Sequence, residues 1–293
     1  MSTDDPRPDE VRTDVTLHAP AAEAILRAAS EVAGVELSNP ADLGGSLRST
    51  VLRCRTAESV HRRANLARLW AGYGRGTPSW EEDPWLARTT AGLLTLLPEA
   101  GIAAPPELAG ELARIEAVSE DDYPAFTPGD TCPDNNLLTP DGLRLLDFES
   151  ACFQSVFLTA AYCRMPFSTC WCVYNLPSEP AEEIEQAYRE EVVVAYPALA
   201  DDTVWRAGIR QAIAAWTVST TVWVLPRVAE EDRPIHRTRR PVPTMRQVLR
   251  HRWEMASTLE EFPAFAETMR LMLSKVAGAW DVPPLPGYPA FGG

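Results

Sequence analysis

Lysine is almost absent from this chain, because Lys275 is the only lysine among its 27 basic Lys and Arg residues. Chemistry that needs a lysine ammonium before the C-terminal region therefore has none to use. Acidic residues number 41, and the formal net charge is −14. A negative field of this size disfavours sequence-independent binding to nucleic acid. It favours a cationic small molecule as the partner.

The chain also lacks long apolar segments. No uninterrupted apolar run is long enough to cross a membrane, and the first residues, MSTDDPRPDE, hold no apolar segment of the kind found in signal peptides. We therefore expect a cytoplasmic protein without a membrane partner. The sequence leaves its oligomeric state open.

Cysteine is sparse as well, with six residues in 293. In a reducing cytoplasm we expect these cysteines to be free thiols. The segment TCWC (169–172) has no second Cys pair or His cluster nearby at metal-ligand spacing, which disfavours a structural metal site.

Apolar periodicity and turn residues predict a mainly helical chain with some strands. Gly44 and Gly45 predict a turn, and residues 50–54 a strand after it. The composition shifts near residue 120 from a mixed region to a helical one. The predicted helices cover residues 20–34, 58–74, 77–101, 105–118, 155–164, 179–194, 201–225 and segments from 245 onward.

Three tryptophans mark the helix predicted over 201–225. Trp205, Trp216 and Trp223 follow one another at intervals that place them on one stripe of a helix. This stripe predicts a core-facing surface, and an aromatic wall of a substrate pocket is the alternative.

The chain has a single basic run, DRPIHRTRRPVPTMRQVLRHRW, over residues 232–253. A solvated loop that pairs with the acidic surface is the simpler interpretation. Contact with a phosphate group is the alternative.

The segment TPGDTCPDNNLLTPDGLRLLDFE (127–149) carries the clearest chemical signal. Its TPDG turn (139–142) predicts a β-hairpin over 136–148, which folds Asp147 back toward the start of the first strand. Asp130, Asn135 and Asp147 then converge, and their oxygen atoms are hard ligands that suit Mg²⁺ on nucleotide phosphates. Alternatively, Asp130 and Asn135 only cap and close a loop.

The same residues, GDTCPDNNLL…LRLLDFE, resemble the catalytic segment of the aminoglycoside phosphotransferase and choline-kinase-like family. The resemblance covers residues 126–149. It implies an α+β, protein-kinase-like fold with two lobes. Residues 1–119 would form a reduced N-terminal β lobe with a helical connection, and residues 120–293 a mainly helical catalytic lobe.

The resemblance also implies roles for single residues. Asp130 would be the catalytic base, Asn135 and Asp147 would hold Mg²⁺, and Glu149 would support the site. The γ-phosphoryl group of ATP or GTP would pass to a hydroxyl of a small molecule, catalysed by positioning and charge neutralisation. Gly44, Gly45 and Ser46 would form the loop that covers the nucleotide phosphates, although an ordinary turn explains them almost as well.

Two departures separate this chain from the family pattern. Pro128 stands where the family has a His before Gly-Asp, and proline has no N–H to donate. The nucleotide-contacting Lys of the N-terminal lobe has no counterpart, and the lobe is several tens of residues short. Four arginines are candidates for the missing charge: Arg53, Arg55, Arg62 and Arg63.

Three hypotheses follow from this combination. The chain is an active small-molecule phosphotransferase with a reduced nucleotide lobe, a catalytically impaired kinase-like module that binds a ligand or partner, or the deletion product of a once complete gene.

Overall fold

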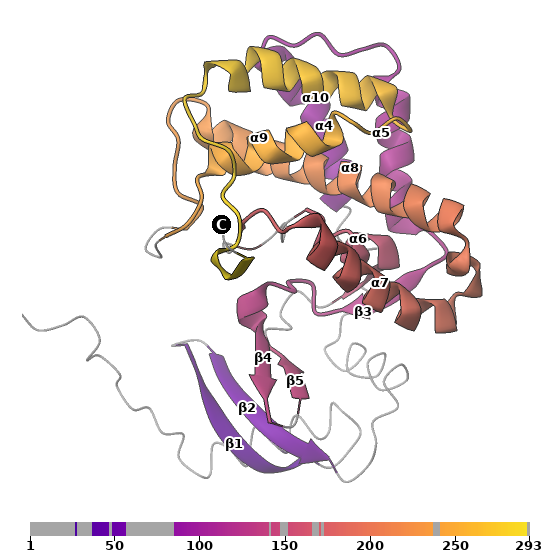
Figure 1. Cartoon of the computed structure of the whole chain (residues 1–293), viewed down its shortest axis with the longest axis vertical. Coiled ribbons are helices and arrows are strands. Elements are labelled where there is room, and N and C mark those ends of the chain that lie inside the picture. The colour runs from indigo at the N-terminus through magenta and orange to yellow at the C-terminus, as the bar shows by residue number, and fades with distance from the viewer. Residues whose placement is uncertain are drawn as a thin grey trace, which may run out of the picture. The chain divides into compact units, whose positions relative to one another are not determined.

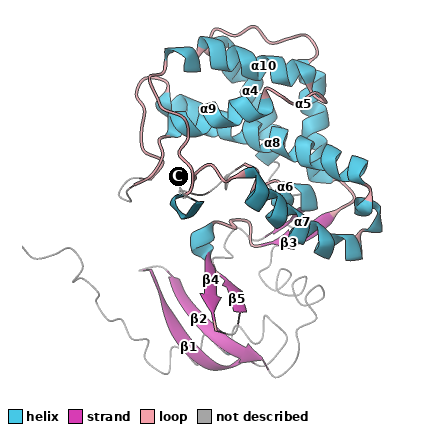
Figure 2. Cartoon of the chain, in the orientation of Figure 1, coloured by secondary structure: helices cyan, strands magenta, loops and turns pink. Residues whose placement is uncertain are grey.

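The computed structural model describes most of the chain and divides it into two compact units, Met1–Pro78 and Ser79–Gly293. The described residues are mostly helical, with three two-stranded antiparallel sheets, which confirms a mixed α and β composition (Figure 2). The functional division at residue 119 stays a prediction. The description covers residues 27, 37–46, 49–56, 85–140, 142–146, 152–165, 170, 173–236 and 241–291.

The first unit contains one hairpin, of strands β1 (Leu37–Ser46) and β2 (Ser49–Thr56). The strand predicted over 50–54 is confirmed. The turn predicted at Gly44 and Gly45 is wrong, because both residues belong to β1 and Gly45 pairs with Thr50. The register shifts between Asp42 and Gly45, and glycines are common at such strand irregularities. The helices predicted over 20–34 and 58–74 lie outside the described residues, apart from helical Arg27.

The second unit is built around the long helix α8 (Asp202–Val228), which packs against four other helices (Figure 1). The helices predicted over 77–101, 105–118, 179–194 and 201–225 are confirmed in their described parts. The one predicted over 155–164 is shorter than expected. The remaining helices are α4 (Trp85–Glu99), α5 (Leu108–Glu116), α6 (Val156–Ala160), α7 (Ser178–Ala195), α9 (Met245–Ala256) and α10 (Pro263–Lys275).

The tryptophan stripe of α8 faces the core over only part of its length. Trp205 and Trp216 are 2% and 8% exposed, as predicted for a core-facing stripe. Trp223 is 57% exposed, so the prediction is wrong there. Periodicity gives the direction of a side chain and not the extent of the surface that covers it. The guanidinium carbon of Arg227 lies over the Trp223 ring, 5.3 Å from its centroid.

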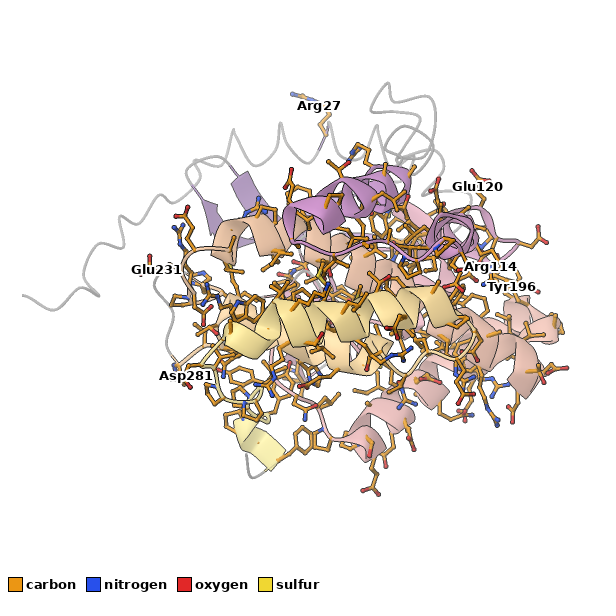
Figure 3. The ribbon with its side chains drawn as sticks, turned by 90° about the horizontal axis from the view of Figure 1, so that it is seen from above. Arg27, Arg114, Glu120, Tyr196, Glu231 and Asp281 are labelled. Carbon is orange, nitrogen blue, oxygen red and sulfur yellow. A yellow bond between two sulfur atoms is a disulfide. The ribbon has the colours of Figure 1, made fainter. Side chains whose placement is uncertain are left out.

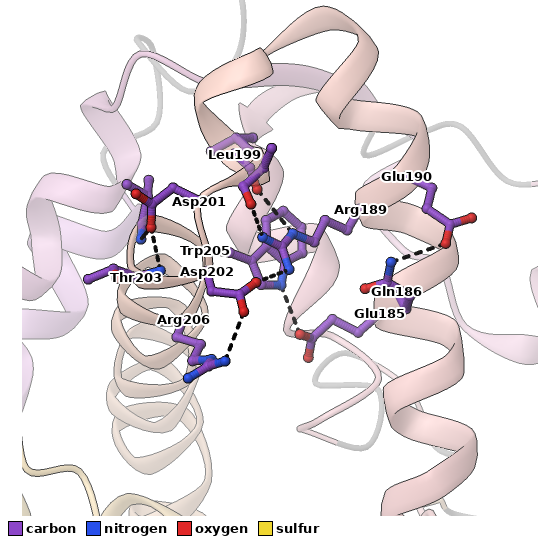
Figure 4. A network of polar contacts seen from close by, with 12 residues as sticks. Glu185, Gln186, Arg189, Glu190, Leu199, Asp201, Asp202, Thr203, Trp205 and Arg206 are labelled. Atoms are coloured by element: carbon purple, nitrogen blue, oxygen red, sulfur yellow. Dashed lines mark hydrogen bonds and ion pairs between the residues drawn. The ribbon is translucent and has the colours of Figure 1, made fainter.

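The start of α8 is fixed to α7 by a polar network (Figure 4). The Asp201 side chain caps the helix and accepts from the backbone N–H of Thr203 at 2.7 Å. These backbone hydrogen bonds lower the pKa of Asp201. Arg189 of α7 donates to Asp202 at 2.7 Å and to the backbone oxygen of Leu199 at 3.0 Å. The turn between the two helices is therefore closed by side chains of both.

The solvated loop predicted over 232–253 is found only in the first half of the run, where the described residues 232–236 and 241–244 are loop and Arg233 is exposed. Most of its second half forms α9, and Arg252 is 1% exposed. Arg246 donates to the backbone oxygens of Val228 and Ala229. The Arg246 guanidinium therefore satisfies carbonyl groups at the C-terminal end of α8, which have no partner within the helix.

Charged side chains lie over the outside of the helical unit, where Figure 3 labels Glu120, Glu231 and Asp281, all exposed. None of the helices in the described ranges combines the length and the apolar character that a membrane span requires.

A glycine in α8 allows α6 to pack closely, and we expect Gly208→Ala to lower the free energy of unfolding by about 1–3 kcal/mol. The new methyl group would overlap the Phe157 ring. Urea denaturation of the purified variant measures the effect. Gly110→Ala on α5 is the matched control, since its methyl group meets nothing within 4 Å. The control should gain up to about 1 kcal/mol, and an equal gain in both variants would contradict close packing at Gly208.

Candidate functional site

The candidate site lies on a loop between two small sheets of the second unit. Strand β3 (Pro124–Thr127) pairs with β6 (Cys152–Ser155) and leads into the loop. The short 3-10 helix η2 (Pro133–Asn135) ends the loop and continues into the hairpin of β4 (Asn136–Thr139) and β5 (Gly142–Leu145). The hairpin predicted over 136–148 is confirmed in its described part. Gly142 has a φ of 105°, which glycine adopts without steric cost.

The turn that carries Pro128 is closed by its neighbours. Thr127 is extended and buried, and its hydroxyl accepts from the backbone N–H of Gly129 at 3.2 Å. Gly129 has a φ of 87°, a conformation that side chains with a Cβ rarely adopt. Pro128 itself is buried. The chain therefore turns sharply into Asp130 without any hydrogen bond from residue 128.

Asp130 and Asn135 lie together, as predicted. The amide Nδ2 of Asn135 donates to the backbone oxygen of Asp130 at 3.1 Å. The Asp130 Oδ1 atom accepts from the backbone N–H of Cys132 at 3.1 Å, which is an Asx-type closure of the loop. Asp130 and Asn135 thus close the loop, as expected if their role is to cap it. This role leaves their chemistry compatible with catalysis, since the contacts orient a carboxylate and an amide in one place.

The returning strand of the hairpin comes back to the same place. The backbone N–H of Leu146 donates to the backbone oxygen of Asn135 at 2.8 Å, and Leu145 pairs with Asn136. Leu146 directly precedes Asp147 in the sequence. Asp147 and Glu149 themselves lie outside the described residues.

Whether this loop can bind Mg²⁺ depends on the oxygen atoms that its side chains can offer to the ion. Asn135 uses its Nδ2 on the Asp130 carbonyl, so the amide points its oxygen away from that carbonyl. An amide oxygen is a hard donor of the kind that Mg²⁺ accepts. Among the described residues no three His, Cys, Asp or Glu side chains group together as a metal site would require. The second predicted ligand, Asp147, lies outside that part of the chain.

The predicted phosphate-covering residues belong to the other unit. Gly44, Gly45 and Ser46 are the last residues of β1, and Ser46 pairs with Ser49 at the end of the hairpin. Their role toward a nucleotide stays a prediction.

A disulfide next to Asp130 corrects the expectation that all cysteines are free thiols. Cys132 is bonded to Cys170, and their Cα atoms lie 5.3 Å apart. Cys132 is buried, and its backbone N–H donates to the Asp130 carboxylate. This pair could not be predicted from the sequence, because the two residues lie 38 positions apart and only folding brings them together.

A tyrosine also reaches the loop, and the sequence did not point to it. The hydroxyl of Tyr162 donates to Asp130 Oδ1 at 3.1 Å across 32 positions of sequence. Tyr162 follows α6 and is 4% exposed. The neighbouring residue, Cys163, is a free thiol in the described part of the chain, and burial raises its pKa to about 11.

Comparison with known proteins adds no assignment: the chain matches no protein-family model and no curated protein sequence.

We expect reduction of the Cys132–Cys170 disulfide to lower the free energy of unfolding by about 2–4 kcal/mol, because the bond restricts the unfolded chain. Denaturation with and without a dithiol reductant measures this difference. The double variant Cys132→Ser/Cys170→Ser should unfold equally in both conditions.

Cys163→Ala is the matched control and should keep the full difference between the two conditions. Thiol alkylation at pH 8 followed by mass spectrometry identifies the bonded pair directly, and Cys163 should react slowly because a thiol with a raised pKa holds little thiolate. Fast alkylation of Cys132 and Cys170 without reductant would contradict the disulfide.

Proposed function

We propose that this protein is a phosphotransferase that moves the γ-phosphoryl group of ATP or GTP to a hydroxyl of a small molecule. The observation that carries the proposal is the loop from Asp130 to Asn135, in which a carboxylate and an amide are held together. The hairpin supports it, since Leu146 returns to Asn135. The resemblance of residues 126–149 to the aminoglycoside phosphotransferase and choline-kinase-like family gives this arrangement its chemical meaning, within a proposed protein-kinase-like fold.

In the proposed reaction Asp130 orients the acceptor hydroxyl and takes its proton. The acceptor oxygen forms a bond to the γ-phosphorus as the bond from that phosphorus to the β–γ bridging oxygen breaks, which leaves ADP or GDP. Asn135 and Asp147 would hold Mg²⁺, which neutralises phosphate charge when it is bound. The negative net charge favours an acceptor that carries a positive charge.

Besides Mg²⁺, arginine side chains would have to supply the positive charge for the nucleotide. The single lysine, Lys275, donates from Nζ to the backbone oxygen of Gly101 at 3.4 Å in the helical unit. Arg53 and Arg55 belong to β2, whereas Arg62 and Arg63 lie outside the described residues. A planar guanidinium binds phosphate oxygens in pairs, so it can replace the charge of a lysine with a different geometry.

The second candidate function is a kinase-like module that binds a ligand without turnover. Two differences from the family that this chain resembles favour the second candidate. Pro128 replaces the histidine that precedes Gly-Asp in that family, and the nucleotide-contacting lysine of that family has no counterpart here. Calorimetry with ATP–Mg²⁺ and with GTP–Mg²⁺ separates the two candidates when it is combined with a turnover assay. Binding accompanied by turnover would exclude the impaired module.

We expect Asp130→Asn to lower kcat by about 100- to 10,000-fold, because the amide cannot accept the hydroxyl proton. Transfer from ATP–Mg²⁺ to a panel of amino sugars and amino alcohols measures the loss, and phosphate release from ATP measures transfer to water.

Asp281→Asn is the matched control, since it makes the same chemical change on an exposed side chain of the helical unit and should keep full activity (Figure 3). Equal kcat in the two variants would rule out Asp130 as the base. No turnover by the unaltered protein with any acceptor, water included, would argue against the phosphotransferase.

A further inference from the structure

The loop of Asp130 is tied to the helical core by a side chain that the proposed reaction does not use. Tyr162 donates its hydroxyl to Asp130 Oδ1, the atom that also accepts from the backbone N–H of Cys132, and both distances are 3.1 Å. The terminal torsion of an aspartate side chain is broad, so a carboxylate with one donor can still rotate. Two donors on one oxygen, arriving from a loop and from a helical turn, fix the plane of the carboxylate.

Tyr162 is itself held firmly by the core. Its ring packs edge-on against Trp216 of α8, with ring centroids 6.0 Å apart. Trp216 is anchored in turn, because its indole N–H donates to the backbone oxygen of Leu158 at 2.9 Å. The Tyr162 backbone N–H donates to the oxygen of Thr159 at 3.1 Å. The position of the phenol oxygen is therefore set by α6 and α8 and not by the loop.

A buried cation clamps the same turn from behind. Arg252 of α9 is 1% exposed and donates from Nη2 to the backbone oxygen of Met165, three residues after Tyr162, at 3.0 Å. Its Nη1 donates to the Thr220 hydroxyl, and its Nε has no hydrogen-bond partner within the described part of the chain. Burial lowers the pKa of Arg252 to about 10, and the nearby Tyr162 opposes that shift.

The cost of this arrangement indicates that it does more than fill the core. Burying a guanidinium with an unpartnered N–H is expensive, and an apolar side chain of similar volume would avoid the cost. The turn that Arg252 holds also carries Tyr162, whose hydroxyl reaches the loop of Asp130.

We propose that Tyr162 is a positioning residue for the Asp130 carboxylate, and that Arg252 holds Tyr162 in place by clamping its turn. The inference rests on the proposed function, in which Asp130 is the base. In the folded protein the hydroxyl of Tyr162 keeps one carboxylate oxygen fixed, and the direction of the other oxygen follows from it. Tyr162 takes no proton and touches no substrate in this role.

The test is the Tyr162→Phe variant, which removes one oxygen atom and keeps the ring against Trp216. With ATP–Mg²⁺ as the probe and phosphate release as the readout, we expect kcat to fall about 10- to 100-fold, because a misplaced base loses rate. KM for ATP should change less than about twofold, because the proposed role gives the phenol no contact with the nucleotide. A purely structural role would not separate kcat from KM.

Tyr188→Phe is the matched control. Tyr188 is also largely buried, and its hydroxyl is hydrogen-bonded to Thr159 of α6 and not to Asp130. Its kcat should stay within about twofold of the unaltered protein. Equal kcat for Tyr162→Phe and the unaltered protein, or equal losses in both tyrosine variants, would overturn the inference and leave the proposed function standing.

A second measurement does not depend on activity. A double-mutant cycle of Tyr162→Phe and Asp130→Asn, measured by urea denaturation, should give non-additive effects, because the two side chains are in contact. If the unaltered protein shows no turnover, the proposed function fails and the cycle alone decides whether the contact exists. Additive effects would show that the two side chains do not interact, and would overturn the inference even in an active protein.

Discussion

The buried guanidinium of Arg252 is the constraint on which the helical unit depends. A charge in the core is tolerated only where hydrogen bonds meet it, and Arg252 finds them on two separate elements, at Thr220 of α8 and at Met165 after α6. Both elements must therefore meet α9 at the correct distance before the charge is compensated. The neighbouring Trp253 makes the same demand, since its indole N–H donates to the Thr221 hydroxyl of α8 at 2.9 Å. The packing of α8, α9 and the turn after α6 is specified by these polar contacts as well as by apolar burial.

The candidate site combines a self-contained loop with a few links to that core. The loop closes through backbone and side-chain hydrogen bonds between Asp130, Cys132 and Asn135, and the hairpin that follows carries exposed leucines, with Leu138 82% exposed. The leucines of the hairpin bury too little surface to fix its position within the helical unit. Links to the rest of the unit include the β3–β6 pairing, the disulfide and the hydroxyl of Tyr162. A loop that is rigid in itself gains a defined position only through such links.

The features that could be predicted from sequence are those that neighbouring residues decide. The TPDG turn and its glycine specify the hairpin within a few residues, and the period of apolar residues specifies α8. The Asp130–Asn135 contact also spans only five positions. Features that depend on distant segments were missed, namely the Cys132–Cys170 bond and the contact of Tyr162. The prediction for Trp223 is wrong for a related reason, because its exposure depends on which distant segments pack beside it and not on its spacing along the helix.

Pro128 cannot donate a hydrogen bond to the loop, yet Asp130 and Asn135 are held close together there. A histidine at that position can brace a loop through its ring nitrogens, and proline cannot. Here the Thr127 hydroxyl closes the turn, and Tyr162 and the Cys132 backbone hold the carboxylate. Other residues therefore brace this loop, so the proline at position 128 does not by itself argue against the proposed function. The scarcity of positive charge is the stronger argument, since phosphoryl transfer depends on neutralising the phosphate oxygens. The only lysine, Lys275, donates a hydrogen bond to a backbone carbonyl of the helical unit. Mg²⁺ and arginine would therefore have to supply that charge.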